Sequence, residues 1–282
     1  MFHRKECEGV PPPPRRRDRK PGPGDPGARQ QGAQRGGSRP LPARSPRPPA
    51  AAALPPRAPR VREPELPDDI TARDLDRDAR AELRSLPESL ADKVALHLVA
   101  AGRFLDEDPQ VAREHAWFAR KLAPRLAVVR EAAGITAYAA GDYAAALAEL
   151  RAVRRMTGDP STLPIMADCE RGMGRPERAL ALARDPEVKK LDAAAKVELG
   201  IVVSGARRDR GEFDAAVVAL QGPALDSDKL QPWTPRLWYA YAAALEDAGR
   251  KDDALRWFES VAAIDEAEET DAADRAAALS NG

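Results

Sequence analysis

The sequence predicts an all-α domain that follows a disordered N-terminal arm. Three observations lead to this prediction. Apolar residues recur at helical spacing from about Asp68 onward, no stretch sustains the apolar–polar alternation of a β-strand, and a glycine-centred pattern repeats along the chain. We therefore expect two parts: an arm at residues 1–67 and a helical domain at residues 68–282.

The arm lacks the side chains that build a hydrophobic core. Residues 1–67 contain 17 of the 27 prolines, 7 of the 19 glycines and one aromatic residue, Phe2. So little apolar surface cannot offset the roughly 1–2 kcal/mol per residue that ordering a backbone costs. We therefore expect the arm to be disordered. A solubilising tail and a translated stretch upstream of the true start are the alternative interpretations of this segment.

Charge divides the chain at the same place. The 45 basic and 45 acidic residues cancel overall, but residues 1–66 hold 15 basic and 6 acidic residues, a net charge of +9, which leaves −9 on the remainder. The densest basic cluster consists of Arg15, Arg16, Arg17, Arg19 and Lys20. Arginines bind phosphates through paired hydrogen bonds and counterion release, so weak contact of the arm with RNA or DNA, without sequence preference, is expected. A Pro-rich ligand for another domain and contact with the chain's own acidic C-terminal end are alternative roles.

Capping signals predict the first helices of the domain. Thr71 and Asp74 have the spacing of a capping box, so we expect a helix from Thr71 to about Leu86. Pro87 suits the first turn of the next helix, because that position needs no N–H donor.

The domain then repeats as helix pairs. Glycines spaced by 33, 37 and 38 residues mark four turns: Gly141, Gly174, Gly211 and Gly249. An alanine stands five residues after each: Ala146, Ala179, Ala216 and Ala254. A turn without glycine, at Glu107, fits the same spacing. Because glycine ends a helix and small residues let helices cross closely, the pattern predicts five antiparallel helix pairs.

Two of these pairs are irregular. In the third, Asp185-Pro186 predicts a short second helix, and in the fourth the pattern breaks at Gly222-Pro223. A last short helix around residues 270–279 is expected to cap the array.

The repeats resemble tetratricopeptide repeats (TPRs). The residues that carry the resemblance are Gly134, Tyr138, Gly141, Tyr143 and Ala146 in the second pair and Trp238, Tyr241, Ala242, Gly249, Ala254 and Phe258 in the fifth. The resemblance covers about residues 88–266 and implies a short right-handed α-solenoid of about five pairs, plus a leading and a capping helix. The layout is also similar to bacterial TPR proteins with an Arg-rich disordered arm, and the excess of arginine over lysine is typical of a GC-rich bacterial genome.

The resemblance implies that the first helix of each pair lines a concave surface. The residues thirteen, ten, six and three positions before each turn should then face it: Val94, His97, Ala101, Phe104, Val128, Glu131, Ile135, Tyr138, Ser161, Pro164, Asp168, Arg171, Glu198, Ile201, Gly205, Arg208, Arg236, Tyr239, Ala243 and Glu246. The candidate binding residues among them are His97, Phe104, Glu131, Ile135, Tyr138, Asp168, Arg171, Arg208 and Tyr239. None of the twenty is Lys or Asn, with which the family's best-known receptors bind a C-terminal carboxylate, so that mode of binding is not expected. Trp238 and Phe258 are assigned to packing, whereas Trp117 and Trp257 are possible exposed contact points.

Catalytic and metal-binding patterns are not found. His97 and His115 have no third ligand nearby in the sequence, and a zinc site needs three or four, so the two are interpreted as ordinary helix residues. No nucleophile elbow, phosphate-binding loop or redox cysteine pair is present. We therefore expect a protein that is not an enzyme and that holds no metal or cofactor.

The leading functional hypothesis is a scaffold that binds a partner protein or peptide on its concave face, with the arm as a weak electrostatic tether. The alternative is a nucleic-acid-associated accessory protein whose Arg-rich arm binds RNA or DNA. A cytoplasmic location is expected, because the N-terminus lacks the apolar core of a secretory signal. No apolar run is long enough to span a bilayer, so no membrane partner is expected.

Overall fold

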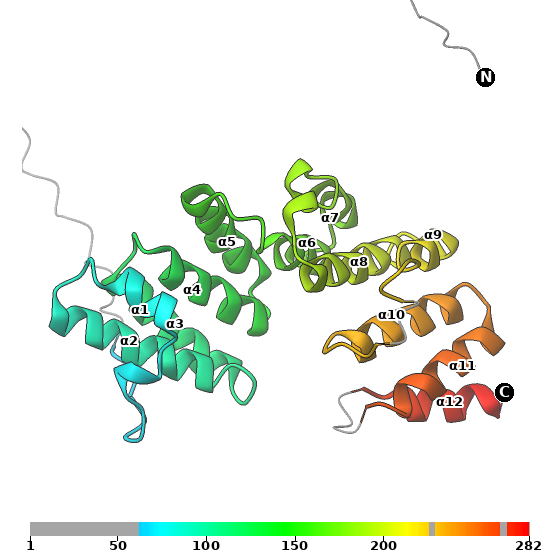
Figure 1. Ribbon diagram of the computed structural model, residues 1–282, viewed down its shortest axis with the longest axis horizontal. Coiled ribbons are helices and arrows are strands. Elements are labelled where there is room, and N and C mark those ends of the chain that lie inside the picture. The colour runs from blue at the N-terminus through cyan, green and yellow to red at the C-terminus, as the bar shows by residue number, and fades with distance from the viewer. Residues whose placement is uncertain (1–61, 226–228, 266–269, 282) are drawn as a thin grey trace, which may run out of the picture. The chain divides into compact units, whose positions relative to one another are not determined.

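The regular structure of the domain is entirely helical, as predicted (Figure 1). The computed structural model describes residues 62–225, 229–265 and 270–281, and within these ranges no residue lies in a strand. The basic cluster at residues 15–20, and the arm up to residue 61, lie outside the described residues. No helix in the described ranges is long and apolar enough to cross a membrane.

The start of the domain differs from the prediction of one helix between Thr71 and Leu86. A 3₁₀ turn, η1 (Ala72–Asp74), is followed by a separate short helix, α1 (Arg77–Leu83). The capping box holds only the first turn, in which the Asp74 carboxylate accepts a hydrogen bond of 2.7 Å from the Thr71 N–H. The Asp76 carboxylate then accepts hydrogen bonds from the backbone N–H groups of the following turn, so it caps a new helix instead of continuing the old one.

The segment before η1 is attached to the domain. Glu63 lies on the arm side of the predicted boundary at residue 67, yet its carboxylate is 2.6 Å from Nζ of Lys93. Asp69 forms a similar ion pair of 2.6 Å with Arg103. Both partners lie on the helix that begins at Glu88, so ion pairs with the domain start at least as early in the chain as Glu63.

Helices then follow one another in pairs. They are α2 (Glu88–Arg103), α3 (Pro109–Leu122), α4 (Ala127–Ala139), α5 (Tyr143–Thr157), α6 (Leu163–Gly172), α7 (Pro176–Leu182), the 3₁₀ helix η2 (Pro186–Lys190), α8 (Ala193–Arg208), α9 (Phe213–Val218), α10 (Thr234–Asp247), α11 (Lys251–Ala262) and α12 (Ala272–Ser280). Each first helix contacts its own second helix and also the first helix of the next pair, from α2 to α10 (Figure 1). This is the packing of a helical repeat, in which each pair buries its apolar faces against its neighbours.

Glycine and alanine occupy the tight places within the pairs. The four turn glycines have φ between 71° and 79°, a left-handed conformation that ends the first helix of each pair. The alanines five residues after these glycines are at most 1% exposed. Within α4, a Cβ at Gly134 would lie 2.7 Å from Cδ2 of Leu150, so only glycine lets α4 and α5 approach this closely.

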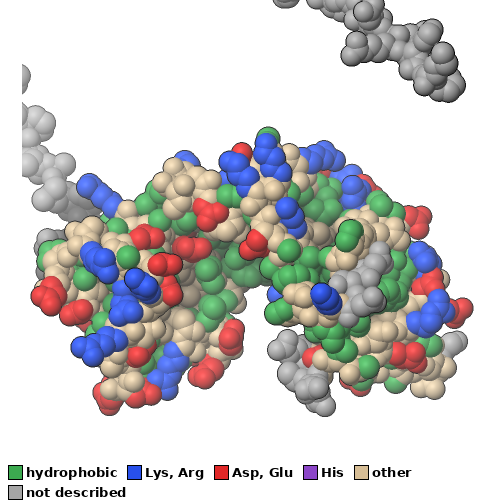
Figure 2. Space-filling model, viewed as in Figure 1, with side chains coloured by type: hydrophobic (Ala, Val, Ile, Leu, Met, Phe, Trp, Pro, Cys, Tyr) green, Lys and Arg blue, Asp and Glu red, His purple; other side chains and the backbone are tan. Residues whose placement is uncertain are grey.

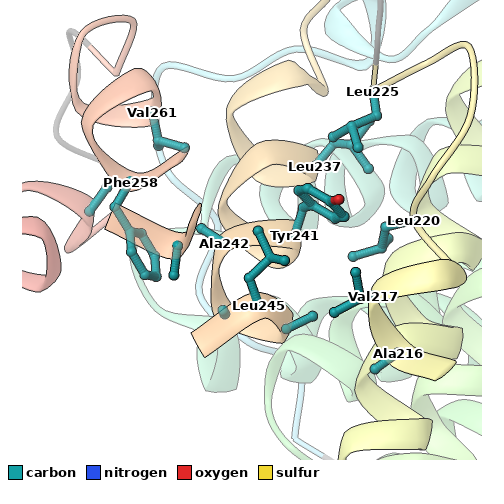
Figure 3. Packing of buried hydrophobic residues seen from close by; sticks show 14 of the residues in the cluster. Ala216, Val217, Leu220, Leu225, Leu237, Tyr241, Ala242, Leu245, Phe258 and Val261 are labelled. Carbon is teal, nitrogen blue, oxygen red and sulfur yellow. The ribbon is translucent and has the colours of Figure 1, made fainter. Parts of the chain in front are cut away.

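The largest core cluster joins α8 to α12 (Figure 3). Phe258 and Leu245 are fully buried in it. Trp257, a possible exposed contact point from the sequence, packs against the rings of Trp238 and Tyr241 at centroid distances of 5.5 and 5.1 Å. Trp257 therefore packs against this core.

Trp117, the other possible contact point, lies on α3 under two guanidinium groups. The Cζ atoms of Arg113 and Arg120 are 5.9 and 5.0 Å from its ring. The indole is therefore partly covered by the chain's own cations.

Candidate functional site

A groove of about 670 Å³ runs along the first helices of the pairs. It is lined by Leu105, Asp106, Ile135, Tyr138, Ala139, Ser161, Pro164, Ile165, Asp168, Arg171, Ala195, Glu198, Ile201, Val202 and Arg236. We call it the inner groove. Its walls come from the turn after α2 and from α4, α6, α8 and α10, so residues far apart in sequence meet there. On the face shown in Figure 2 the molecule is hollowed between α2–α5 and α10–α12, and hydrophobic side chains gather along the hollow.

Counting back from the turn glycines predicted many of the residues that line this groove. Nine lining residues occupy predicted inward-facing positions: Ile135, Tyr138, Ser161, Pro164, Asp168, Arg171, Glu198, Ile201 and Arg236. Positions three, six, ten and thirteen before a turn share one face of a helix, which is why the offsets select one wall. The spacing missed the remaining residues, including Ile165 and Val202, which border the same face.

The prediction is wrong for the first pair. His97 is fully buried, and its Nδ1 lies 2.9 Å from Nδ1 of His115 between α2 and α3. Phe104 stacks on the His115 ring at a centroid distance of 5.9 Å instead of facing the groove. The offsets fail because α2 ends at Arg103, four residues before the turn at Glu107, whereas the other first helices end two or three residues before their turn glycine.

Several other predicted residues also lie outside the inner groove. Val94, Ala101 and Ala243 are at most 2% exposed and belong to the core. Glu131 is partly buried on α4 and does not line the groove. Burial, together with the nearby carboxylate of Asp159, raises the pKa of Glu131 above its ordinary value.

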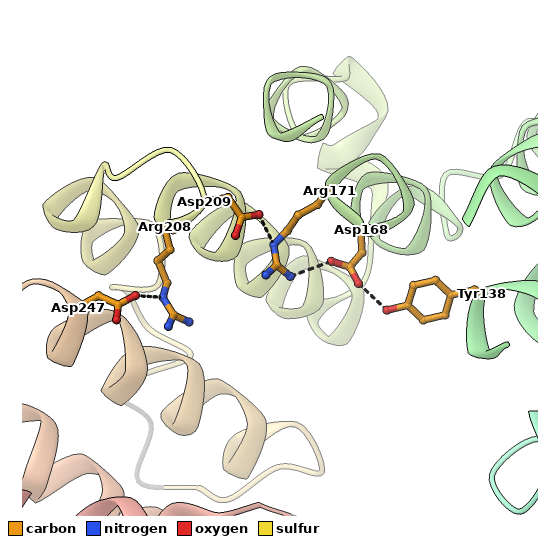
Figure 4. A network of polar contacts seen from close by, with 6 residues as sticks. All are labelled: Tyr138, Asp168, Arg171, Arg208, Asp209 and Asp247. Carbon is orange, nitrogen blue, oxygen red and sulfur yellow. Dashed lines mark hydrogen bonds and ion pairs between the residues drawn. The ribbon is translucent and has the colours of Figure 1, made fainter. Parts of the chain in front are cut away.

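Polar contacts join the first helices along the groove (Figure 4). The Tyr138 hydroxyl donates a hydrogen bond of 2.5 Å to Asp168, which also accepts one of 3.3 Å from Arg171. Burial and the bond to Asp168 raise the pKa of Tyr138, so its hydroxyl stays protonated and acts as a donor. Nε of Arg171 continues the chain of contacts to Asp209 at 2.7 Å.

The same contact recurs one pair later. Nε of Arg208 donates a hydrogen bond of 2.6 Å to Asp247, just as Arg171 donates to Asp209 (Figure 4). Each arginine stands three residues before its turn glycine, and each aspartate two residues before the next one. We call Tyr138, Asp168, Arg171, Asp209, Arg208 and Asp247 the polar ladder. These repeated offsets are visible in the sequence when successive pairs are aligned on their turn glycines.

A second pocket of about 370 Å³ adjoins the inner groove. It is lined by Arg171, Ile201, Ser204, Gly205, Arg208, Pro235, Arg236, Tyr239, Ala240 and Thr270. We call it the arginine pocket, and it shares three lining residues with the groove. Tyr239 is held at its edge, since its hydroxyl donates a hydrogen bond of 2.5 Å to Asp271.

Outside the groove, the buried carboxylates are paired. Glu149 is 5% exposed and lies 2.6 and 2.7 Å from Arg120 and Arg130. Glu170 is 1% exposed and lies 2.7 Å from Arg151. These pairs link α3 and α4 to α5, and α5 to α6.

The described residues include no group of three or more histidine, cysteine, aspartate and glutamate side chains placed to hold a metal ion. Comparison of the chain with protein-family models and with curated proteins finds no match.

Proposed function

We propose that the chain is a scaffold that binds a peptide segment of a partner protein in the inner groove. The observation that carries the proposal is the convergence of side chains from α4, α6, α8 and α10, together with the turn after α2, on one continuous groove. A surface built from one helix face of each repeat suits an elongated ligand, because each repeat contributes one contact point along it.

A TPR-like, right-handed solenoid is part of the proposal. It is supported by the left-handed turn glycines, by the buried alanines that follow them and by the contacts between successive first helices. In such an array the first helices face the ligand and the second helices face outward.

The chemistry of the groove favours binding over catalysis. Ile135, Pro164 and Ile201 offer apolar contacts. The most enclosed acid of the groove, Asp168, is already occupied by Tyr138 and Arg171. A general base must be within reach of a substrate proton, whereas this carboxylate holds neighbouring helices together.

Selection of a displayed library of random peptides on the full-length chain tests the proposal. Enriched peptides should bind at least about tenfold more weakly to Ile201→Arg, which adds a long charged side chain to the groove. The matched control is Val218→Arg, at a 64% exposed position on α9, and it should bind like the wild type. Equal affinity for both variants, or no enriched peptide, would refute groove binding.

The alternative function rests on the basic cluster of the arm, Arg15, Arg16, Arg17, Arg19 and Lys20. Replacing all five by glutamine in the full-length chain should abolish salt-sensitive binding of a single-stranded RNA, if the arm carries that affinity. Unchanged RNA binding by this variant would exclude the cluster as the contact.

A further inference from the structure

The arginine pocket concentrates positive charge on an otherwise acidic domain. Arg171, Arg208 and Arg236 come from α6, α8 and α10, three successive first helices. Among the described residues that line the pocket there is no aspartate or glutamate. The carboxylates that pair with these arginines do not line the pocket, so the charged groups in its wall are all guanidiniums, in a domain whose residues 67–282 carry a net charge of −9.

Two of the arginines are held by carboxylates that do not line the pocket. Arg171 is fixed by Asp209 and Arg208 by Asp247, in both cases through Nε. A guanidinium carries five N–H donors, so a bond at Nε orients the group and leaves the terminal nitrogens of Arg208 for another acceptor. Two nitrogens of a guanidinium match the two oxygens of a carboxylate or phosphate.

Arg236 is anchored more loosely. Its terminal nitrogen is 3.0 Å from the Glu198 carboxylate, and its side chain is 61% exposed. It can therefore adjust to a ligand, whereas the other two arginines are pre-oriented by the polar ladder.

Two neighbouring residues of α8 complete the pocket. Ser204 is 1% exposed, and its hydroxyl has no hydrogen-bond partner among the described residues. Most buried polar groups have one, so this hydroxyl is an unsatisfied polar group in the lining of the pocket. A Cβ at Gly205 would lie 2.8 Å from Cζ of Arg171, so the guanidinium of Arg171 rests directly on α8 because this residue is glycine.

We propose that the arginine pocket binds one anionic group, a carboxylate or a phosphate, carried by the peptide in the inner groove. This inference rests on the proposed function. Groove and pocket share Arg171, Ile201 and Arg236, so a peptide lying in the groove can place one side chain in the pocket. The acidic surroundings repel that anion elsewhere, and the pocket therefore fixes the position of the peptide as well as adding affinity.

Three synthetic versions of one selected peptide test the proposal. The most enriched peptide with a single acidic residue is made with glutamate, glutamine or phosphoserine at that position, and its affinity for the full-length chain is measured by fluorescence anisotropy. The glutamate or the phosphoserine version should bind about tenfold more tightly than the glutamine version, as for charge-assisted hydrogen bonds. Which anion is preferred identifies the source of the charge. Equal affinities, or enriched peptides without acidic residues, would overturn the proposal.

Two variants then test whether the preference for the anionic peptide arises in the arginine pocket. Arg208→Gln should abolish it while the affinity for the glutamine version stays within about twofold. Arg155→Gln is the matched control, because Arg155 is exposed on α5, away from the groove, and the preference should persist. A loss of affinity for all versions alike would show that Arg208 only shapes the groove and would contradict the proposal.

Gly205→Ala perturbs Arg171 without changing any charge. The added methyl must displace the guanidinium, the mobile end of a flexible side chain, while alanine favours the helix. The melting temperature should be unchanged or higher and the anion preference several-fold weaker; an unaltered preference argues against Arg171. If the glutamine version binds the wild type but not Ile201→Arg, the proposed function stands although the anion site fails.

Discussion

The α4–α5 and α8–α9 pairs are built on one pattern but packed differently. The second helix α5 has 15 residues, whereas α9 has 6. A Cβ at Gly134 of α4 would lie 2.7 Å from the Leu150 side chain, but a Cβ at Gly200 of α8 would lie 3.7 Å from the nearest atom, the Ala219 carbonyl oxygen. A mostly apolar pocket of about 660 Å³ is lined by α8, by residues 219–224 after α9 and by the start of α10. Val218 and Leu230 are 64% and 57% exposed.

This difference indicates which side of the array is structurally constrained. The second helices vary in length, yet α4, α6, α8 and α10 keep their mutual contacts and together line the inner groove. Irregularity is therefore tolerated on the side of the second helices, while the side that forms the groove is maintained.

The largest effect is expected for two leucines at equivalent positions, one on α5 and one just after α9. Leu150 and Leu220 each stand nine residues after a turn glycine, and they are 0% and 5% exposed. Leu150→Ala should lower the free energy of unfolding by about 4 kcal/mol and Leu220→Ala by about 2 kcal/mol, because the looser α9 region already borders a cavity. Urea unfolding followed by circular dichroism measures both. Equal losses would mean that the pairs are packed equally well.

A smaller effect is expected from adding one methyl group to each first helix. Gly134→Ala should cost about 2 kcal/mol, since the new Cβ overlaps the fully buried Leu150. Gly200→Ala meets only ordinary contacts and should be neutral or stabilise by up to about 1 kcal/mol, through the higher helix propensity of alanine. Thermal unfolding of the two variants checks this, and a stabilised Gly134→Ala would contradict the close approach of α4 and α5.

A third effect concerns the first pair, which has a polar centre, and it develops only when the pH is lowered. Burial lowers the pKa of His115 to about 4, with a further contribution from His97, whose own pKa burial also lowers. Unfolded histidine titrates near pH 6.5, so the unfolded chain binds more protons between pH 6.5 and 4. Stability should therefore fall as the pH is lowered through this window, by up to about 1.4 kcal/mol per pH unit for His115.

The double variant His97→Leu/His115→Leu serves as the control for this pH dependence. Replacing both hydrogen-bonded partners by apolar groups removes the titration without leaving one imidazole unpaired. Urea unfolding at several pH values should give a shallower slope for the double variant than for the wild type. Identical slopes would assign the acid sensitivity to carboxylates such as Glu63, which lies 3.5 Å from Nε2 of His97.

Sequence periodicity predicted the helical class and much of the groove, because turn glycines and helical spacing are local features. Ile135, Tyr138 and Arg171 were found by counting back from a glycine that does end the helix. Counting from Glu107 failed for His97 and Phe104, since no residue there fixes where α2 ends.

Spacing within one helix does not predict the polar ladder or the histidine pair, although the offsets of the ladder's arginines and aspartates from the turn glycines recur in successive pairs. Arg171 and Asp209 are 38 residues apart, and their contact depends on how two successive pairs stack. The Nδ1 contact between His97 and His115 depends on the rotation of α2 and α3 about their axes. Both are tertiary properties that a single helix period does not encode.

Amide hydrogen exchange of the full-length chain, with and without a selected peptide, tests the central claim most directly. Binding in the inner groove should slow exchange in α4, α6, α8 and α10 and leave α5, α9 and α11 unchanged, because the helices that line the groove are all first helices. Slower exchange confined to α5, α9 and α11 would place the ligand on the opposite side of the array and contradict the account.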